Sequence, residues 1–267
     1  MNERLLILTE ALSKEVKKVI NDYKVTEQEL LRAIDFLNET GKQNEFHLLS
    51  DVLGISVEVN ELTHGVHHDH HENTTSYNVE GPLYRDEAPL LNRPVKLCGD
   101  DEPGEILLLS GQVLSSKDGS PLANAILDVW QANEHGYYEN QDPDQEEFNL
   151  RGRLQTDEEG RYEFKTILPG AYEIGRGGPV GEFLKAQARH AWRPAHIHFK
   201  VTAEDHTPLT TMLFVPDDPY IDSDTIGAVK DSLILKLNKS YDEELAKSYH
   251  IKDHFFISSF DFILRAK

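Results

Sequence analysis

The spacing of hydrophobic residues changes near Glu105, and this change constrains the fold more than any other feature of the sequence. Before it, apolar residues recur every three or four positions, which is typical of amphipathic helices. After it the period becomes two, and in residues 125–130 the set Ala125, Leu127 and Val129 alternates with the set Ile126, Asp128 and Trp130, which is typical of β-strands. The sequence therefore predicts an α+β protein that is mainly β, with a helical N-terminal part.

Three helices are predicted in that N-terminal part. Residues 3–21 carry apolar side chains at helical spacing, with charged residues between them. A second helix begins at Thr26, which forms a capping-box pattern with Glu29, and Gly41 suits its end. Residues 44–62 form the third, although a glycine and β-branched residues disfavour its second half. Such helices can hardly bury a large core alone, so we expect them to pack on the rest of the chain, on a second copy, or on both.

A histidine-rich run, residues 64–72, follows the helices. Tracts of this kind occur in metal-binding segments and in solvated linkers. The run has no apolar periodicity, and a structural metal site needs fixed ligands, so the linker is favoured. We divide the chain here, into a helical region of residues 1–72 and a second region of residues 73–267, which begins with an irregular stretch rich in proline and glycine.

Turn sequences punctuate the second region. Residues 117–120 supply a hairpin turn, and residues 157–160 supply another that leads into a returning strand, residues 161–166. A short helix is predicted at residues 182–189, and further strands lie around Ile197, Leu213 and Ile257. Several short strands with regular turns predict an antiparallel β-sandwich.

The composition argues against several classes of protein. The formal net charge of −20 disfavours binding to nucleic acid or to an anionic membrane, because phosphate surfaces are met by clusters of Lys and Arg. Cys98 is the only cysteine, so no intramolecular disulfide can form and a reducing compartment fits best. The N-terminus lacks a signal-peptide pattern, and no apolar run approaches the ~20 residues that span a bilayer. We therefore expect a cytoplasmic protein.

Candidate metal ligands of two chemical kinds lie between Tyr138 and His198. In a strand over residues 193–201, the period of two places His196 and His198 on one face and apolar residues on the other. Tyr138 and Tyr172 would bind as phenolates only beside a strong cation, because the ordinary pKa of tyrosine is about 10. Two anionic oxygens and two imidazoles suit ferric iron better than zinc. The usual motifs of hydrolases, nucleotide-binding proteins and structural zinc sites do not occur.

Residues 78–260 resemble the intradiol ring-cleavage dioxygenases, non-haem ferric enzymes that insert both oxygen atoms of O2 between the hydroxylated carbons of a catechol. The resemblance rests on seven motifs in the family's order: Gly81–Tyr84, Asp128–Asn133, Gly136–Tyr138, Arg151–Arg153, Leu168–Tyr172, Arg193–His198 and Asp217–Tyr220. The helical region also resembles the dimerisation region of the catechol and hydroxyquinol branches. The resemblance thus implies a homodimer and allows a lipid between its protomers.

The same resemblance implies roles for individual residues. Fe(III) would be held by Tyr138 and His196 as equatorial ligands and by Tyr172 and His198 as axial ligands. Tyr137 is a rival to Tyr138, but the family's Gly-x-Tyr spacing favours the second tyrosine. In the family the axial tyrosine leaves the iron when substrate binds and helps to take up a proton. Arg193 matches an arginine that stabilises negative charge developing on the ring.

The residues of several motifs resemble those of the hydroxyquinol (1,2,4-trihydroxybenzene) branch more than those of the catechol branch. Leu48 and Asp51 match positions that reach the substrate pocket in that branch, and the carboxylate would accept a hydrogen bond from the third hydroxyl, which catechol lacks. The comparison places further residues on the pocket wall: Val79, Gly81, Pro82, Leu83, Ile174, Arg193 and Ile226.

The predicted reaction is cleavage of hydroxyquinol by O2 to 3-hydroxy-cis,cis-muconate, equivalently maleylacetate, in the catabolism of aromatic compounds. Two alternatives stay open, a catechol 1,2-dioxygenase that forms cis,cis-muconate and a non-catalytic β-sandwich binding module. Three residues depart from the family. Met212 stands where glutamine is frequent, and Glu80 and Glu173 replace residues that are often uncharged.

Overall fold

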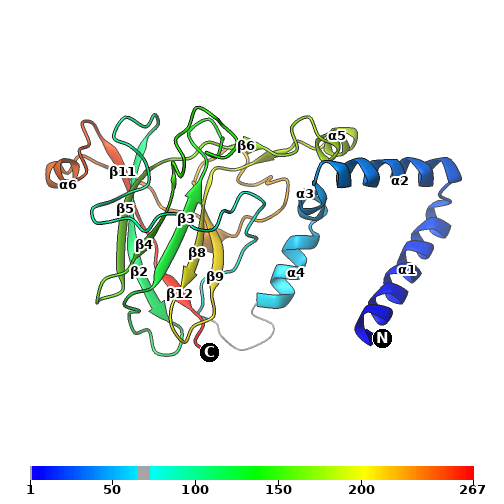
Figure 1. Ribbon diagram of the computed structural model, residues 1–267, viewed down its shortest axis with the longest axis horizontal. Coiled ribbons are helices and arrows are strands. Elements are labelled where there is room, and N and C mark those ends of the chain that lie inside the picture. The colour runs from blue at the N-terminus through cyan, green and yellow to red at the C-terminus, as the bar shows by residue number, and fades with distance from the viewer. Residues whose placement is uncertain (1, 65–72) are drawn as a thin grey trace.

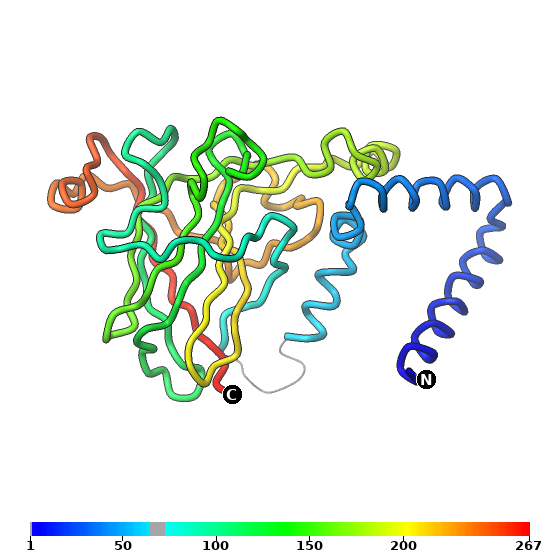
Figure 2. Tube along the Cα trace, in the orientation of Figure 1, coloured from blue at the N-terminus to red at the C-terminus, as the bar shows by residue number. Residues whose placement is uncertain are grey.

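The structure is a computed structural model that describes residues 2–64 and 73–267. The helical part lies to one side of the β part, and the first helix runs from the outer end of the second and stands apart from the remainder of the chain (Figure 1). The N-terminus lies at the free end of that helix and the C-terminus at the base of the β part (Figure 2). In the described ranges, no helix is both long enough and apolar enough to cross a membrane. Most of the histidine-rich run, residues 65–72, lies outside the described residues.

Four helices form the N-terminal part: α1 (Glu3–Tyr23), α2 (Glu27–Lys42), α3 (Phe46–Val52) and α4 (Ile55–His64). The capping box at the start of α2 is present, because Thr26 Oγ1 accepts the N–H of Glu29 at 3.3 Å and the Glu29 carboxylate accepts the N–H of Thr26 at 2.8 Å. The prediction of one helix over residues 44–62 is wrong. It is divided by Gly54, whose φ of 72° lies in the left-handed region that ends a helix.

The helices differ in how far they pack on the rest of the chain. Phe36 of α2 stacks on Phe183 of α5 (Pro179–Ala186), with ring centroids 5.1 Å apart. No residue of α1 is buried, and its apolar side chains are open to solvent, as in Leu12 with 67% exposure. Arg189 donates a hydrogen bond to the carbonyl oxygen of Val52 on α3 at 3.1 Å, and Asn60 of α4 donates one to that of Asn78 at 3.3 Å. Helices α2, α3 and α4 therefore contact the second region, whereas the apolar face of α1 is uncovered.

The β part contains two main sheets. The larger has the order β1-β5-β2-β11-β10, with β12 also beside β2, and the smaller has the order β4-β3-β8-β9. The strands of the larger sheet are β1 (Val95–Lys96), β2 (Ile106–Ser115), β5 (Arg161–Ile167), β10 (Asn238–Ser240), β11 (Phe255–Ser259) and β12 (Phe262–Leu264). Those of the smaller are β3 (Ile126–Gln131), β4 (Arg151–Gln155), β8 (His196–Thr202) and β9 (Leu209–Phe214). Strands β6 (Tyr172–Glu173) and β7 (Trp192–Arg193) form a separate pair, and η1 (Asp231–Leu233) and α6 (Glu243–Ser248) complete the elements.

The prediction that all strands are antiparallel is correct for the smaller sheet and wrong for the larger. Strands β11 and β12 both run parallel to β2, and β1 runs parallel to β5. These partners are far apart in the chain, so no hairpin fixes their relative direction. Residues 117–120 form the expected turn, but the chain returns to β2 only at one bridge, between Leu114 and Pro121, before β3 joins the other sheet.

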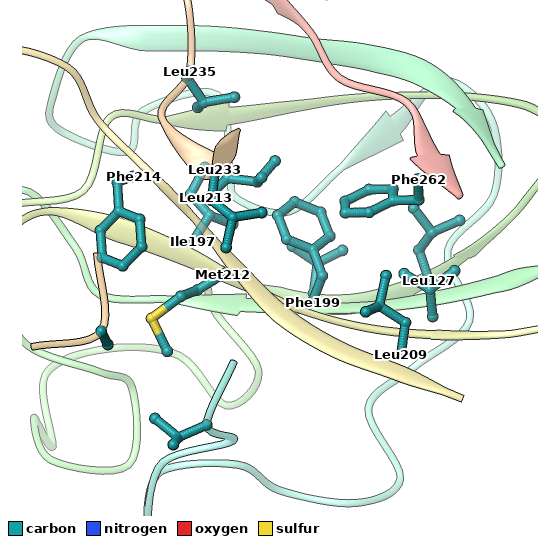
Figure 3. Packing of buried hydrophobic residues seen from close by; sticks show 14 of the residues in the cluster. Leu127, Ile197, Phe199, Leu209, Met212, Leu213, Phe214, Leu233, Leu235 and Phe262 are labelled. Atoms are coloured by element: carbon teal, nitrogen blue, oxygen red, sulfur yellow. The ribbon is translucent and has the colours of Figure 1, made fainter. Parts of the chain in front are cut away.

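Residues from both main sheets build one hydrophobic core (Figure 3). Ile197 and Phe199 of β8 are fully buried in it, and the ring of Phe199 lies 4.9 Å from that of Phe262 on β12. One face of β8 thus packs against the larger sheet, as the period of two predicts. Its opposite face carries His196 and His198. The short helix α5 begins at Pro179, three residues before its predicted start, because proline suits the first turn of a helix.

Candidate metal centre

Strand β8 brings two histidine side chains together in the interior. The Nε2 atoms of His196 and His198 lie 3.1 Å apart, and both residues are buried. The Nδ1 atom of His196 is 2.7 Å from the carbonyl oxygen of Pro194, which assigns the ring proton to Nδ1 and leaves a lone pair on Nε2. Burial, followed by the charge of Arg193, lowers the pKa of His196 to about 3, and burial lowers the pKa of His198 well below its ordinary value. Both rings are therefore neutral, as a metal ligand must be.

Two tyrosines complete the group. Tyr172 on β6 places its hydroxyl oxygen 3.4 Å from His196 Nε2. Tyr138 meets Tyr172 edge to face, with ring centroids 5.7 Å apart. The Tyr138 hydroxyl is buried and has no hydrogen-bond partner among the described residues. Burial raises the pKa of Tyr138 well above its ordinary value, so a phenolate forms there only with a cation bound.

The loop that carries Tyr138 is anchored from both sides. The backbone N–H of Tyr138 donates to Gln141 Oε1 at 3.2 Å. The next residue, Glu139, accepts a hydrogen bond from Arg151 of β4 at 3.0 Å, and both side chains are almost fully buried. Tyr137 takes a different environment, because it is 40% exposed and its hydroxyl accepts a hydrogen bond from Arg176 at 2.7 Å. This difference favours Tyr138 over Tyr137 as the ligand.

The donor set fits a single metal ion. The Nε2 atoms of the two imidazoles lie 3.1 Å apart and could bind one ion together, and the buried Tyr138 hydroxyl, which has no hydrogen-bond partner among the described residues, could join them as a third donor. Nitrogen and phenolate oxygen together suit iron. Within residues 2–64 and 73–267, no group of three or more His, Cys, Asp or Glu residues could hold a metal, so this mixed set is the candidate centre.

Trp130 supports His198 from the neighbouring strand. Register places the two residues opposite each other in the β3–β8 pair, and their rings stack 4.7 Å apart at an angle of 6°. Sequence reasoning missed this role, although Trp130 lies in one of the motifs that carry the family resemblance. Knowledge of which residues lie opposite each other in the β3–β8 pair would have revealed the contact between Trp130 and His198. A single sequence does not give this register.

Arg193 lies beside the ligands and is also buried. Its Nη1 atom is 3.3 Å from His196 Nε2, and its Nη2 atom is 3.3 Å from the sulfur of Met212. Asp224 forms an ion pair with the guanidinium at 3.1 Å. Burial would raise the pKa of Asp224, but the charge and hydrogen bonds of Arg193 outweigh it and hold this pKa below its ordinary value. The ion pair with Asp224 therefore stabilises the positive charge of Arg193 at a buried position.

A cavity of about 390 Å³ opens in front of this group. All nine residues predicted for the pocket wall line it, together with Tyr138, Tyr172 and His198: Leu48, Asp51, Val79, Gly81, Pro82, Leu83, Ile174, Arg193 and Ile226. His196 is not part of the lining and lies behind, in contact with Tyr172 and His198. Sequence reasoning missed several lining residues: Glu45, Gly136, Tyr137, Gln141, Glu173, Gly175 and Arg176.

The helical part supplies one wall of the cavity. Asp51 on α3 is 8% exposed, and burial raises the pKa of its carboxyl, although Ser56 and Arg193 act in the opposite direction. Glu45, at the start of α3, accepts the backbone N–H of Val180 at 2.9 Å and so joins α3 to the first turn of α5. Both unusual glutamates have cationic partners, since Glu80 pairs with Lys200 and Glu173 pairs with Arg176. Neither departure leaves an unpaired carboxylate at the site.

A mainly β fold that gathers two buried imidazoles, a buried phenol and a partly buried phenol beside one cavity fits the donor set of a non-haem iron oxidoreductase. Comparisons with known proteins agree. The family described as "Dioxygenase" matches residues 79–266, and that described as "Catechol dioxygenase N terminus" matches residues 2–71. The chain belongs to the intradiol ring-cleavage dioxygenases, a family of enzymes rather than of non-catalytic binding modules.

Individual relatives are similar over nearly the whole chain. Hydroxyquinol 1,2-dioxygenase of Rhizobium sp. (strain MTP-10005) is 39% identical over 99% of this chain and 88% of its own length. Catechol 1,2-dioxygenase of Acinetobacter baylyi is 34% identical over 97% of this chain and 85% of its own. The solved structure of hydroxyquinol 1,2-dioxygenase from Pseudomonas putida DLL-E4 has a TM-score of 0.89 and 36% identity, covering 100% of this chain and 93% of that one.

Proposed function

We propose that this protein cleaves hydroxyquinol between its adjacent hydroxylated carbons, with O2 as co-substrate and 3-hydroxy-cis,cis-muconate, equivalently maleylacetate, as product. Asp51 carries the proposal, because a buried carboxylate lines the cavity that also holds Arg193, Tyr172 and His198. The third hydroxyl of hydroxyquinol can donate a hydrogen bond to this carboxylate. Catechol has no third hydroxyl and could not make this hydrogen bond, so the contact would favour hydroxyquinol.

The proposed cofactor is Fe(III), held by Tyr138, Tyr172, His196 and His198. When bound, the metal supplies Lewis acidity that lowers the pKa of the tyrosine and substrate hydroxyls. Tyr172 lines the cavity and is the ligand that we assign to taking up a substrate proton. Arg193 provides a preorganised buried cation for negative charge that develops on the ring.

An iron assay and a visible spectrum of the purified protein test the metal. We expect about one iron per chain and a red-brown colour, because phenolate ligands on ferric iron absorb visible light. Tyr138→Phe and His196→Ala should each abolish the colour. Tyr137→Phe is the matched control and should keep it. A colourless protein fully loaded with iron would contradict the ligand set.

Oxygen uptake on hydroxyquinol, catechol, chlorocatechols and pyrogallol tests the substrate. Asp51→Leu should lower kcat/KM for hydroxyquinol by about 10-fold or more relative to its effect on catechol, since a lost hydrogen bond to a substrate hydroxyl discriminates strongly. Asp51→Asn, which keeps the shape and one acceptor oxygen, should have a smaller effect. Equal losses on both substrates would remove Asp51 from this role. Faster cleavage of catechol by the unaltered protein would favour the second candidate, catechol 1,2-dioxygenase.

We also propose that residues 73–267 form a β-sandwich catalytic domain and residues 1–72 a dimerisation region. The core shared by the two main sheets supports the sandwich. The uncovered apolar side chains of α1 support a homodimer, with a second copy of the chain as their cover: Leu5, Leu8, Leu12, Val16 and Val19. A lipid between the protomers would cover the same kind of surface.

A further inference from the structure

One carboxylate fixes the orientation of Arg193. Asp224 Oδ1 lies 3.1 Å from Nε, and Asp224 Oδ2 lies 3.3 Å from Nη2. The two side chains are 4% and 1% exposed. A two-point contact between a planar guanidinium and a carboxylate sets the plane of the guanidinium as well as its position.

Asp224 is itself held by the backbone that follows it. Its Oδ2 atom accepts the N–H of Ala228 at 3.0 Å, and its Oδ1 atom accepts that of Ile226 at 3.4 Å. The N–H of Gly227 donates to the main-chain oxygen of Asp224 at 2.9 Å. Since Ile226 lines the cavity, the carboxylate is tied to a turn in the cavity wall.

These contacts leave Nη1 as the donor group that faces the candidate metal ligands, 3.3 Å from His196 Nε2. The remaining neighbour of Nη2 is the sulfur of Met212, a weak acceptor that carries no charge. Among the described residues, Asp224 is the only carboxylate in an ion pair with Arg193.

We propose that Asp224 is a positioning residue, which holds the Arg193 guanidinium in the cavity wall with Nη1 directed toward His196. The inference concerns the site of the proposed ring cleavage and rests on that function. Without the carboxylate, the guanidinium can turn about its side-chain bonds and loses its charged partner in a dry environment. Negative charge developing on the ring would then lack a cation at a fixed place.

A double-mutant cycle on the iron-loaded protein tests the inference, with Asp224→Asn, Arg193→Lys and both together. Asparagine keeps the shape and one acceptor oxygen. We expect Asp224→Asn to lower kcat by about 10- to 100-fold, which is less than the roughly 100- to 1,000-fold loss on removing a preorganised donor, because the arginine is displaced and not removed. Iron content, the visible band and the anaerobic Kd for substrate should stay near those of the unaltered protein. In the Arg193→Lys background, the same change should have little further effect, because residues that act as one unit are not additive.

A second cycle on the metal-free protein gives a readout independent of turnover. We expect the losses in the free energy of unfolding from Asp224→Asn and Arg193→Lys to be strongly coupled in urea titrations. Asp157→Asn is the matched control, because Asp157 also accepts two backbone N–H groups and pairs with an arginine, but lies in a distant turn. It should leave kcat unchanged.

An unchanged kcat in Asp224→Asn, or additive losses in both cycles, would overturn the inference. If Asp224→Asn does not fold, Asp224→Glu takes its place, since it keeps the charge and displaces the two-point contact by one methylene. Lowered kcat with iron and anaerobic binding retained supports the positioning role, and unchanged kcat overturns it. Absence of oxygen uptake by the unaltered protein on every polyphenol would instead refute the proposed function.

Discussion

At the residue scale, Gly136 decides how closely the two candidate tyrosine ligands approach. Its φ is 80°, and a Cβ atom at this position would lie 2.5 Å from the carbonyl oxygen of Ala171 and 2.7 Å from Cβ of Tyr172. A larger residue would therefore push the Tyr138 loop away from Tyr172. The close approach of Ala171 and Tyr172 thus explains why a glycine stands two residues before Tyr138, which the Gly-x-Tyr spacing alone does not reveal.

We expect Gly136→Ala to lower the free energy of unfolding by about 2 kcal/mol or more, from backbone strain and overpacking together, and to reduce iron content. Gly119→Ala is the matched control, because Gly119 has a similar φ of 73° and no atom within 4 Å of a Cβ there. It should cost about 1 kcal/mol, from the left-handed backbone alone. Urea unfolding and an iron assay measure both effects. Equal losses in the two variants would show that the contact with Tyr172 is unimportant.

Local pattern predicts one part of the candidate site, the pair of histidines, whereas the choice of Tyr138 over Tyr137, the role of Arg193 and the pocket wall came from the family resemblance. The period of two places His196 and His198 on one face of a strand, whatever the rest of the chain does. Asp224 and Trp130 could not be predicted, because their roles depend on which segments meet in space. Asp224 follows Arg193 by many residues, and Trp130 reaches His198 only through strand register.

At the scale of elements, a buried lysine marks the junction of β1 and β5. Lys165 of β5 is 2% exposed, and its Nζ atom lies 2.7 Å from the carboxylate of Asp100. Lys96 of β1 contacts the same oxygen at 2.8 Å, and His250 lies 3.1 Å from the other. These hydrogen bonds, with that of Lys165 the largest, lower the pKa of Asp100. The carboxylate therefore neutralises the positive charge of two lysines, one on each strand.

The lowered pKa fixes the sign of a pH effect. A carboxyl group with a depressed pKa stabilises the folded state above its unfolded pKa of about 3.9, and this contribution is lost as pH falls toward the folded pKa. Asp100→Asn should therefore be clearly less stable than the unaltered protein near neutral pH, with a difference that shrinks below about pH 4. Urea unfolding across this range measures it. The control Asp101→Asn, at an exposed neighbour, should have little effect, and a difference independent of pH would contradict the assignment.

Elements were predictable where their signals are local. The capping box at Thr26 and Glu29 marks the start of α2, and both of its hydrogen bonds form. The break at Gly54 was visible as a weak point, but its outcome depends on packing, because Leu49 and Val52 before it are buried. Strand direction in β11 and β12 had no local signal, so the mixed sheet could not be foreseen.

At the scale of the whole molecule, α1 has an exposed apolar face that a second copy of the chain could bury. The proposed homodimer predicts that charges on its apolar face prevent assembly. Leu8→Lys with Leu12→Lys should convert the dimer to a monomer in sedimentation experiments, because those side chains are 50% and 67% exposed in the single chain. Lys17→Glu, a change of an already charged residue on the same helix, is the control and should stay dimeric. A monomeric unaltered protein would refute the dimer.

In the proposed function, two residues assigned to the choice of substrate come from a different part of the chain than the candidate metal ligands. Leu48 and Asp51 come from a helix early in the chain, whereas the candidate ligands come from β6, β8 and the loop after β3. A gene segment encoding the helices can therefore be exchanged between related chains, with Glu45 as the joint to α5, without touching a ligand. We expect such chimaeras to differ in their preference among phenolic substrates while they keep the same candidate ligands.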